Sequence, residues 1–311
     1  MKINKNKFLL LALSSTAFLS LVGSITGTVA WYQYSTRATA GIIGSSKAVT
    51  QNLQISTDGT NWKSDLSSAD IYEAAKVKTG DENVGSEVSP LTSGNITKDA
   101  KLEKLYDNPV YQNFGDYSTW KNANTSYNKY LTFDLYFQFT KKVNTETTYS
   151  EKEVKLIDLT ILGYKEDGTT VDEDLSKAMR VHFDNDGDKA YALASKNGGE
   201  TSTSGTLDLN GDGKNDSTAR YEWETGTDGI YGEGTQTAYT SEDLLATTDS
   251  DGNLSSGVTL AKTTSTGASN KLTVTIWLEG WEQVNSSATW DNDTFSKGIF
   301  KVGMQFACDA D

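Results

Sequence analysis

The residues best suited to chemistry form one acidic loop, which reads L-D-L-N-G-D-G-K-N-D from Leu207 to Asp216. A Ca²⁺ loop places oxygen ligands at positions 1, 3, 5 and 9, a backbone carbonyl at position 7 and a glycine at position 6. The matching ligands here are Asp208, Asn210, Asp212, the carbonyl of Lys214, and Asp216. The spacing predicts a structural Ca²⁺ site, and the alternative is an acidic glycine turn that binds no metal.

This loop departs from the helix–loop–helix type, because its twelfth position is Ala219 where a bidentate Glu is expected. It is closer to the D-x-D-x-D-G-x-x-D hairpin loops of extracellular β-proteins, including the FG-GAP type, and Glu222 is a candidate for a further ligand. A site of this class in tenfold excess of Ca²⁺ over its Kd adds only about 1.4 kcal/mol to stability. We therefore expect chelation to lower the melting temperature slightly, and Asp212→Ala to copy that effect.

Residues for catalysis are scarce, and the sequence predicts a protein that is not an enzyme. His182 is the only histidine and lies in a strand pattern without an H-E-x-x-H motif. Cys308 is the only cysteine, so no disulfide forms within the chain. The carboxylates of Asp134 and Glu279 fall inside core strands, where the alternation predicts that both face solvent.

The elements that must position the loop are mostly β-strands. Alternating or continuously apolar stretches predict strands at Tyr130–Phe139, Val154–Tyr164, Ala178–Phe183, Lys271–Trp281 and Gly298–Phe306. An Asp58-Gly59 turn predicts a hairpin over residues 51–64, and Asp184–Asp188 favours another turn. A short helix is expected at Thr240–Ala246, and residues 66–78 favour either a short helix or an irregular link. The predicted fold is an all-β, jelly-roll-like antiparallel sandwich with long loops and one or two short helices.

The first thirty residues have the features of an export signal. Lys2, Lys5 and Lys7 precede an apolar stretch from Phe8 to about Val22, and Thr28-Val29-Ala30 matches a cleavage site. We expect cleavage after Ala30, and the alternative is an uncleaved membrane anchor. The predicted domains are the signal peptide at 1–30, an N-terminal strand at 31–50, and a β-sandwich at 51–311 with a calcium-loop insertion around 184–253.

The segment from Trp31 to Ile43 alternates with a period of two, which predicts a half-buried strand. One face carries Tyr32, Tyr34, Ala38, Ala40 and Ile42, and Trp31 begins the other face. No tight turn follows directly, so the strand must pair elsewhere, either in its own chain or in another copy. We interpret it as a candidate donor strand.

The chain is acidic, and this limits its partners. Its 311 residues carry a formal net charge of −14, which becomes −17 when the three leader lysines are removed. Such a charge argues against nucleic acid and anionic membranes as partners. It is typical of a secreted protein that is kept soluble by charge or that binds cations.

The segment T-V-A-W-Y-Q-Y-S-T-R-A-T-A, the following L-Q-I-S, the F-D-L-Y-F strand at Phe133–Phe137 and the terminal T-V-T-I-W-L-E-G-W resemble the TasA/camelysin family. These are exported proteins of Gram-positive bacteria. The resemblance implies a jelly-roll subunit that a SipW-type signal peptidase releases and that forms biofilm-matrix fibres by donor-strand complementation, beside an accessory matrix protein. The acidic loop and the long 79–127 region depart from smaller members.

Two functions follow as expectations. The first is a structural subunit that polymerises head to tail with itself outside a bacterial cell, in the matrix or on the cell surface. The alternative is a monomeric Ca²⁺-dependent adhesin or glycan-binding module, which the acidic loop and the tryptophans favour.

Overall fold

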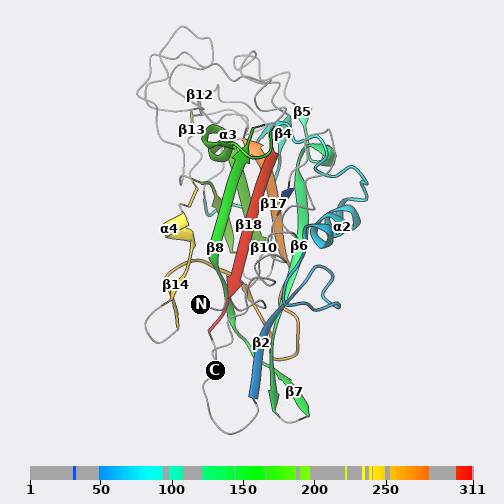
Figure 1. The fold of residues 1–311 in the computed structure, drawn as a ribbon, viewed down its shortest axis with the longest axis vertical. Helices are drawn as coiled ribbons and strands as arrows, with labels where there is room; N and C mark the ends of the chain where they lie inside the picture. The colour runs from blue at the N-terminus through cyan, green and yellow to red at the C-terminus, as the bar shows by residue number, and fades with distance from the viewer. Residues whose placement is uncertain are drawn as a thin grey trace, which may run out of the picture.

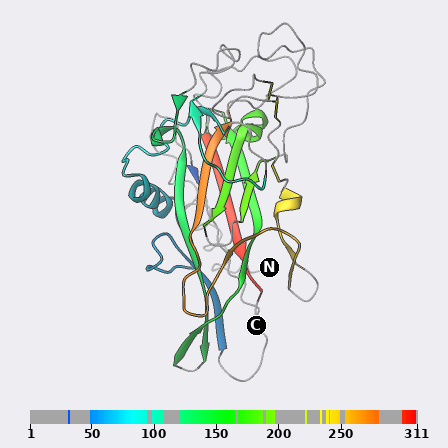
Figure 2. The same ribbon diagram turned by 180° about the vertical axis from the view of Figure 1, so that it is seen from behind.

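The computed structural model describes two sheets that face each other (Figures 1 and 2). It describes residues 31–32, 49–93, 98–107, 121–143, 145–165, 167–186, 190–196, 221–222, 233–234, 238–239, 241–248, 253–279 and 299–309. Figure 1 has β8 and β18 in front, and Figure 2, from behind, brings β6, β10 and β17 forward.

The larger sheet has nine strands. Its centre is antiparallel: β17 (Leu272–Glu279) pairs with β10 (Met179–Asn185) on one side and with β6 (Leu131–Val143) on the other. The remaining strands are β11 (Tyr191–Ala194), β2 (Val49–Ser56), β7 (Glu146–Tyr149), β3 (Pro90–Thr92), β4 (Tyr106–Asp107) and β5 (Lys121–Asn122). β2 and β7 both pair with the far end of β6, and this end projects below the sandwich in Figure 1.

The smaller sheet has five strands. Its main pair is β8 (Glu153–Tyr164) with β18 (Ile299–Ala307), which run antiparallel and carry an irregularity between Gln305 and Phe306. The other strands are β1 (Trp31–Tyr32), β16 (Thr259–Lys262) and β9 (Val171–Asp172). Two small hairpins lie apart: β12 (Tyr221–Glu222) with β13 (Glu233–Gly234), and β14 (Thr247–Thr248) with β15 (Leu254–Ser255).

The core lies between the two sheets and follows the alternation of the strands. Phe137 of β6 packs against Phe306 of β18 with ring centroids 5.0 Å apart. The alternating apolar residues of β6 and β17 are all buried: Leu131, Phe133, Leu135, Phe137, Phe139, Leu272, Val274, Ile276 and Leu278. Each such side chain contributes roughly 1.5–3 kcal/mol, so these strands supply much of the stability.

A second, smaller core lies on the outer face of the larger sheet. Trp277 of β17 and Leu193 of β11 pack there against residues of the segments 98–107 and 121–130. This outer layer is fixed by backbone and side-chain hydrogen bonds, among them Ala123 N–H to the Leu105 carbonyl at 2.8 Å and Leu105 N–H to Asn124 Oδ1 at 2.7 Å. The described residues of 98–107 and 121–130 thus pack against the outer face of the larger sheet.

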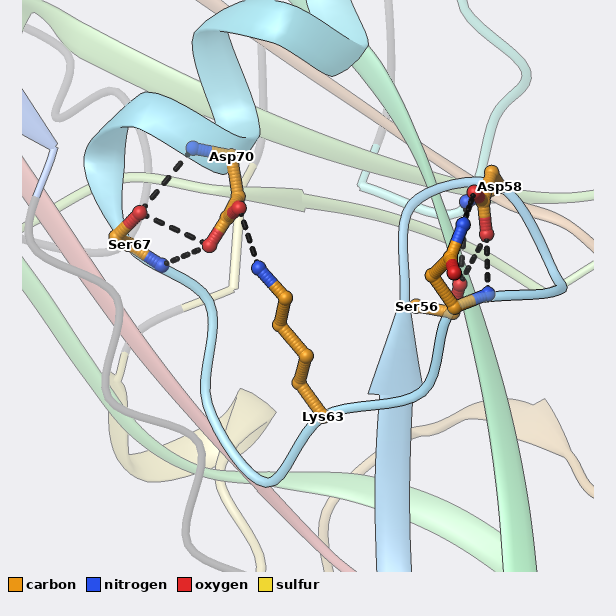
Figure 3. A network of polar contacts seen from close by, with 6 residues as sticks. Ser56, Asp58, Lys63, Ser67 and Asp70 are labelled. Carbon is orange, nitrogen blue, oxygen red and sulfur yellow. Dashed lines mark hydrogen bonds and ion pairs between the residues drawn. The ribbon is translucent and has the colours of Figure 1, made fainter.

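Helix α2 (Ser68–Thr79) resolves the alternatives that the sequence left open for residues 66–78. Ser67 caps it: the Ser67 hydroxyl accepts from Asp70 N–H, and the Asp70 carboxylate accepts from Ser67 N–H, which forms a capping box. Lys63 pairs with Asp70 at 2.6 Å, as Figure 3 shows. At the other end, Gly80 adopts φ 69°, a left-handed conformation that ends the helix.

The turn at Asp58-Gly59 forms as predicted. The Asp58 carboxylate accepts from Thr60 N–H, Asn61 N–H and the Ser56 hydroxyl (Figure 3). These hydrogen bonds, led by the one from Asn61, hold the pKa of Asp58 far below its ordinary value. The returning chain then pairs with β2 at one bridge, Ile55 with Lys63.

The expected antiparallel β-sandwich with long loops is confirmed. The helix expected at Thr240–Ala246 is present as α4 (Ser241–Leu244). A further short helix, α3 (Glu173–Ala178), precedes β10, and a 3-10 turn occupies Tyr127–Lys129. β10 and β11 pair antiparallel on either side of the turn predicted near Asp184–Asp188, and residues 187–189 of that turn lie outside the described residues.

Candidate functional site at the edge of the smaller sheet

The N-terminal strand meets the body of the protein at β18. Trp31 pairs with Lys301 and Tyr32 pairs with Val302, and the two strands run parallel. Parallel strands need a long connection, and most of the chain lies between β1 and β18. Trp31 and Tyr32 are therefore in a strand, as the alternation predicted, and the strand lies at the margin of a sheet.

β18 has two very different edges. Along one edge it pairs with β8 from Ile299 to Ala307, and along the other it receives β1. Its side chains alternate: Phe300, Val302, Met304 and Phe306 are buried in the main core. Lys301 lies on the opposite face, with its ammonium 4.5 Å from the centre of the Tyr164 ring. The strand is thus anchored through one face and one edge.

Two other edges, those of β11 and β8, are paired in part by the chain itself. On β11, Leu193 N–H donates to the Lys98 carbonyl and the Leu193 carbonyl accepts from Tyr239 N–H. On β8, β16 and β9 pair with its two ends, and Ala246 N–H donates to the Leu156 carbonyl between them. Such coverage is the usual protection against pairing with other chains. The N-terminal strand joins the sandwich at β18.

Most residues predicted for function lie outside the described residues. This holds for the cleavage residue Ala30, for Tyr34, Ala38, Ala40 and Ile42 of the strand, and for the five calcium ligands Asp208, Asn210, Asp212, Lys214 and Asp216. Glu222, the candidate further ligand, is described in β12, opposite Glu233. Within the described part of the chain, no group of three or more His, Cys, Asp and Glu residues could hold a metal ion.

His182 has a packing role. It is 1% exposed, and its Nε2 lies 2.8 Å from the Ala100 carbonyl of the outer layer. Burial lowers the pKa of His182 from its ordinary value near 6.5 to about 4, because the charged form would lose its hydration. The imidazole is thus neutral at pH 7, and the neutral Nε2–H donates to that carbonyl. Cys308 is also buried, in the main core.

The prediction that Asp134 and Glu279 face solvent is wrong for Glu279. Its side chain is 0% exposed and accepts a hydrogen bond from Trp277 Nε1 at 3.1 Å. Glu279 does lie on the outer face of β17, as its position in the alternation requires, but that face is covered. Asp134 is partly exposed and bonds to Lys78 of α2 and, at 2.7 Å, to the Thr273 hydroxyl.

Arg180 is a buried charged residue that the sequence reasoning missed. It is 1% exposed and lies opposite Trp277 in the pairing of β10 with β17. Buried charges are costly unless they are paired, so such a residue marks a covered surface. The sequence signal was present: Arg180, His182 and Asp184 alternate with the apolar residues of β10, and the outer layer then covers Arg180 and His182 while Asp184 stays partly exposed.

Comparison of the chain with protein-family models, with curated proteins and with solved structures finds no match. The resemblance to the TasA/camelysin family therefore rests on the sequence motifs alone. Among the described helices, none is long and apolar enough to cross a membrane.

Proposed function

We propose that this chain is an exported structural subunit that polymerises into extracellular fibres by donor-strand complementation. The observation that carries the proposal is the pairing of Trp31 and Tyr32 with Lys301 and Val302 at the edge of a β-sandwich. A segment that completes a sheet from its margin can be supplied by another copy of the same chain.

The geometry of strand addition explains why such contacts give filaments. The donor strand and the acceptor edge are different surfaces of one subunit, so each contact leaves one donor and one acceptor unused. Contacts of this heterologous kind continue as an open chain unless the rotation between subunits closes a ring. Each backbone hydrogen bond of the added strand contributes about 0.5–1.5 kcal/mol net, so an extended donor segment is a strong connector.

The chemistry of the described residues supports a structural role. The one histidine is packed in a covered layer and hydrogen-bonded to a carbonyl, with its pKa near 4. Its environment therefore favours the neutral form in the physiological range, and its Nε2 is engaged. The acidic loop is proposed to act as a Ca²⁺-bound clasp of the surface, separate from assembly.

The test is to express residues 31–311 and residues 44–311 and to examine both by negative-stain electron microscopy. We expect fibres from the longer chain and monomers from the shorter one, because only the longer chain carries the donor strand. Circular dichroism checks that the shorter chain is folded. Fibres from the folded shorter chain would rule out assembly through this segment.

A further inference from the structure

The pairing of β1 with β18 within one chain indicates which edge of the sandwich accepts the N-terminal strand. The same edge on a second copy of the chain can then accept that strand. β1 lies parallel to β18, in a fixed register, on the edge opposite β8. At this edge the sandwich accepts an added strand without disturbing its own hairpins, because β18 is held independently by its complete pairing with β8 and by four buried side chains.

Backbone hydrogen bonds or paired strands already occupy part of three other edges, those of β11, β8 and β2. A strand added to β11 would have to displace the backbone hydrogen bonds that Leu193 makes to Lys98 and Tyr239. A strand added beside either end of β8 would displace β16, β9 or the hydrogen bond from Ala246 to Leu156. At β2, Ile55 exchanges two backbone hydrogen bonds with Lys63, each 2.9 Å long.

We propose that the outer edge of β18 is the acceptor for the N-terminal strand of a second copy, and that an isolated subunit occupies this edge with its own Trp31 and Tyr32. The inference rests on the proposed function. Fibre growth is then an exchange in which each subunit gives up its own strand and takes its neighbour's, in the same parallel direction and with Trp31 opposite Lys301.

Self-occupation gives the monomer a means of delaying assembly. The backbone pairs made with the neighbour's strand are the same as those made with the subunit's own strand, so the exchange itself gains little free energy. The subunit's own strand has the higher effective concentration because it is tethered. Assembly should therefore be slow at first and strongly concentration-dependent, as in domain swapping.

A disulfide between positions 31 and 301 tests the exchange. Adjacent strands lie about 4.8 Å apart, within the range of Cα separations that a disulfide spans. The chain is expressed with its leader, recovered after export, and carries Trp31→Cys and Lys301→Cys in a Cys308→Ser background. Oxidised as a dilute monomer, it should form no fibres, and reductant should restore them. Fibres from the oxidised, cross-linked monomer would overturn the proposal.

A matched control places a disulfide in the same sheet away from this edge. Glu153 and Lys262 are paired across β8 and β16, and their side chains are 57% and 41% exposed. Glu153→Cys with Lys262→Cys, in the same background, should form fibres whether oxidised or reduced. Its fibres show that a disulfide in the small sheet does not by itself block assembly.

A second experiment detects the contact between copies directly and does not depend on the double variant. Trp31→Cys chains and Lys301→Cys chains, each in the Cys308→Ser background, are mixed, assembled under reducing conditions and then oxidised. Disulfide-linked dimers should appear in the mixture and not in either variant alone. Fibres that yield no mixed dimer would overturn the β18 acceptor, whereas absence of fibres from the unmodified chain would overturn the proposed function itself.

Discussion

The outer faces of the two sheets of this sandwich differ in how far other segments bury them. In β8 of the smaller sheet, Ile161 and Gly163 on the core face are buried while Thr160, Leu162 and Tyr164 on the other face are partly exposed. In β10 and β17 of the larger sheet nearly every residue is buried on both faces. The cause is the outer layer made by segments 98–107 and 121–130, which turns the outer face of the larger sheet into a second core.

The difference teaches that polarity does not predict exposure on a covered sheet. Arg180, His182, Thr275 and Glu279 all lie on the outer face of the larger sheet and are 0–7% exposed. They are accommodated by hydrogen bonds, such as that from Trp277 Nε1 to Glu279 and that between the Thr132 and Thr275 hydroxyls. The smaller sheet keeps the simple alternation because its outer residues remain in contact with water.

The largest effect is expected at Trp277, at the centre of the second core. Trp277→Ala removes a side chain that is 0% exposed and the hydrogen bond that its Nε1 donates to Glu279, so the free energy of unfolding should fall by about 3–5 kcal/mol. Leu162→Ala, on the outer face of the smaller sheet, is the control and should cost about 1 kcal/mol. Urea denaturation measures both, and equal losses would remove the distinction between the two faces.

Acid should weaken the covered face through His182. Because its pKa is about 4 in the folded chain and near 6.5 when unfolded, the unfolded state binds a proton more readily as pH falls. Stability is therefore retained above pH 6.5 and falls by about 3 kcal/mol between pH 7.5 and 4 from this residue alone.

His182→Gln keeps a donor for the Ala100 carbonyl and does not titrate. Between pH 7.5 and 4, urea denaturation should show that the variant loses about 3 kcal/mol less free energy of unfolding than the unmodified chain. The exposed Asp58 and Asp167, whose hydrogen bonds hold their pKa values low, are common to both proteins and cancel in the comparison. If the free energy of unfolding of the two proteins changed with pH in parallel, protonation of His182 would not contribute to the loss of stability in acid.

The inner face of the smaller sheet should be intolerant of added volume. A methyl group at Gly163 of β8 would lie 2.7 Å from Leu175 Cβ and 2.9 Å from the Ser176 backbone nitrogen. Gly163→Ala should therefore lower the free energy of unfolding by about 1–3 kcal/mol. Thr160→Val, on the partly exposed face of the same strand, should change it by less than about 0.5 kcal/mol, and thermal melts compare the two.

The smallest effect is expected for the ion pair between Lys78 and Asp134. Both side chains are partly exposed, at 24% and 20%, so solvent screens their attraction. A double-mutant cycle with Lys78→Met and Asp134→Asn should give a coupling of about 0.2–1 kcal/mol. A much larger coupling would show that the outer layer shields α2 and β6 from water as well.

Much of the fold follows from local patterns in the sequence. The alternating apolar residues of β6 and β17 identify the strands and their inner faces, because successive side chains of a strand point to opposite sides. The Asp58-Gly59 turn and the helix at Ser241–Leu244 follow from local hydrogen-bonding chemistry. The alternation of residues 31–43 likewise predicts a strand, and two of its residues are described as one.

The burial of Glu279 and Arg180 and the choice of β18 as the partner of the N-terminal strand depended on the tertiary structure. Local alternation gives the face of a side chain but not what covers that face, and here the cover comes from segments distant in sequence. Pairing between distant strands is likewise decided by which edges the rest of the chain has already occupied. The sequence by itself determined which segment could act as a connecting strand, and only the tertiary structure decided which edge receives it.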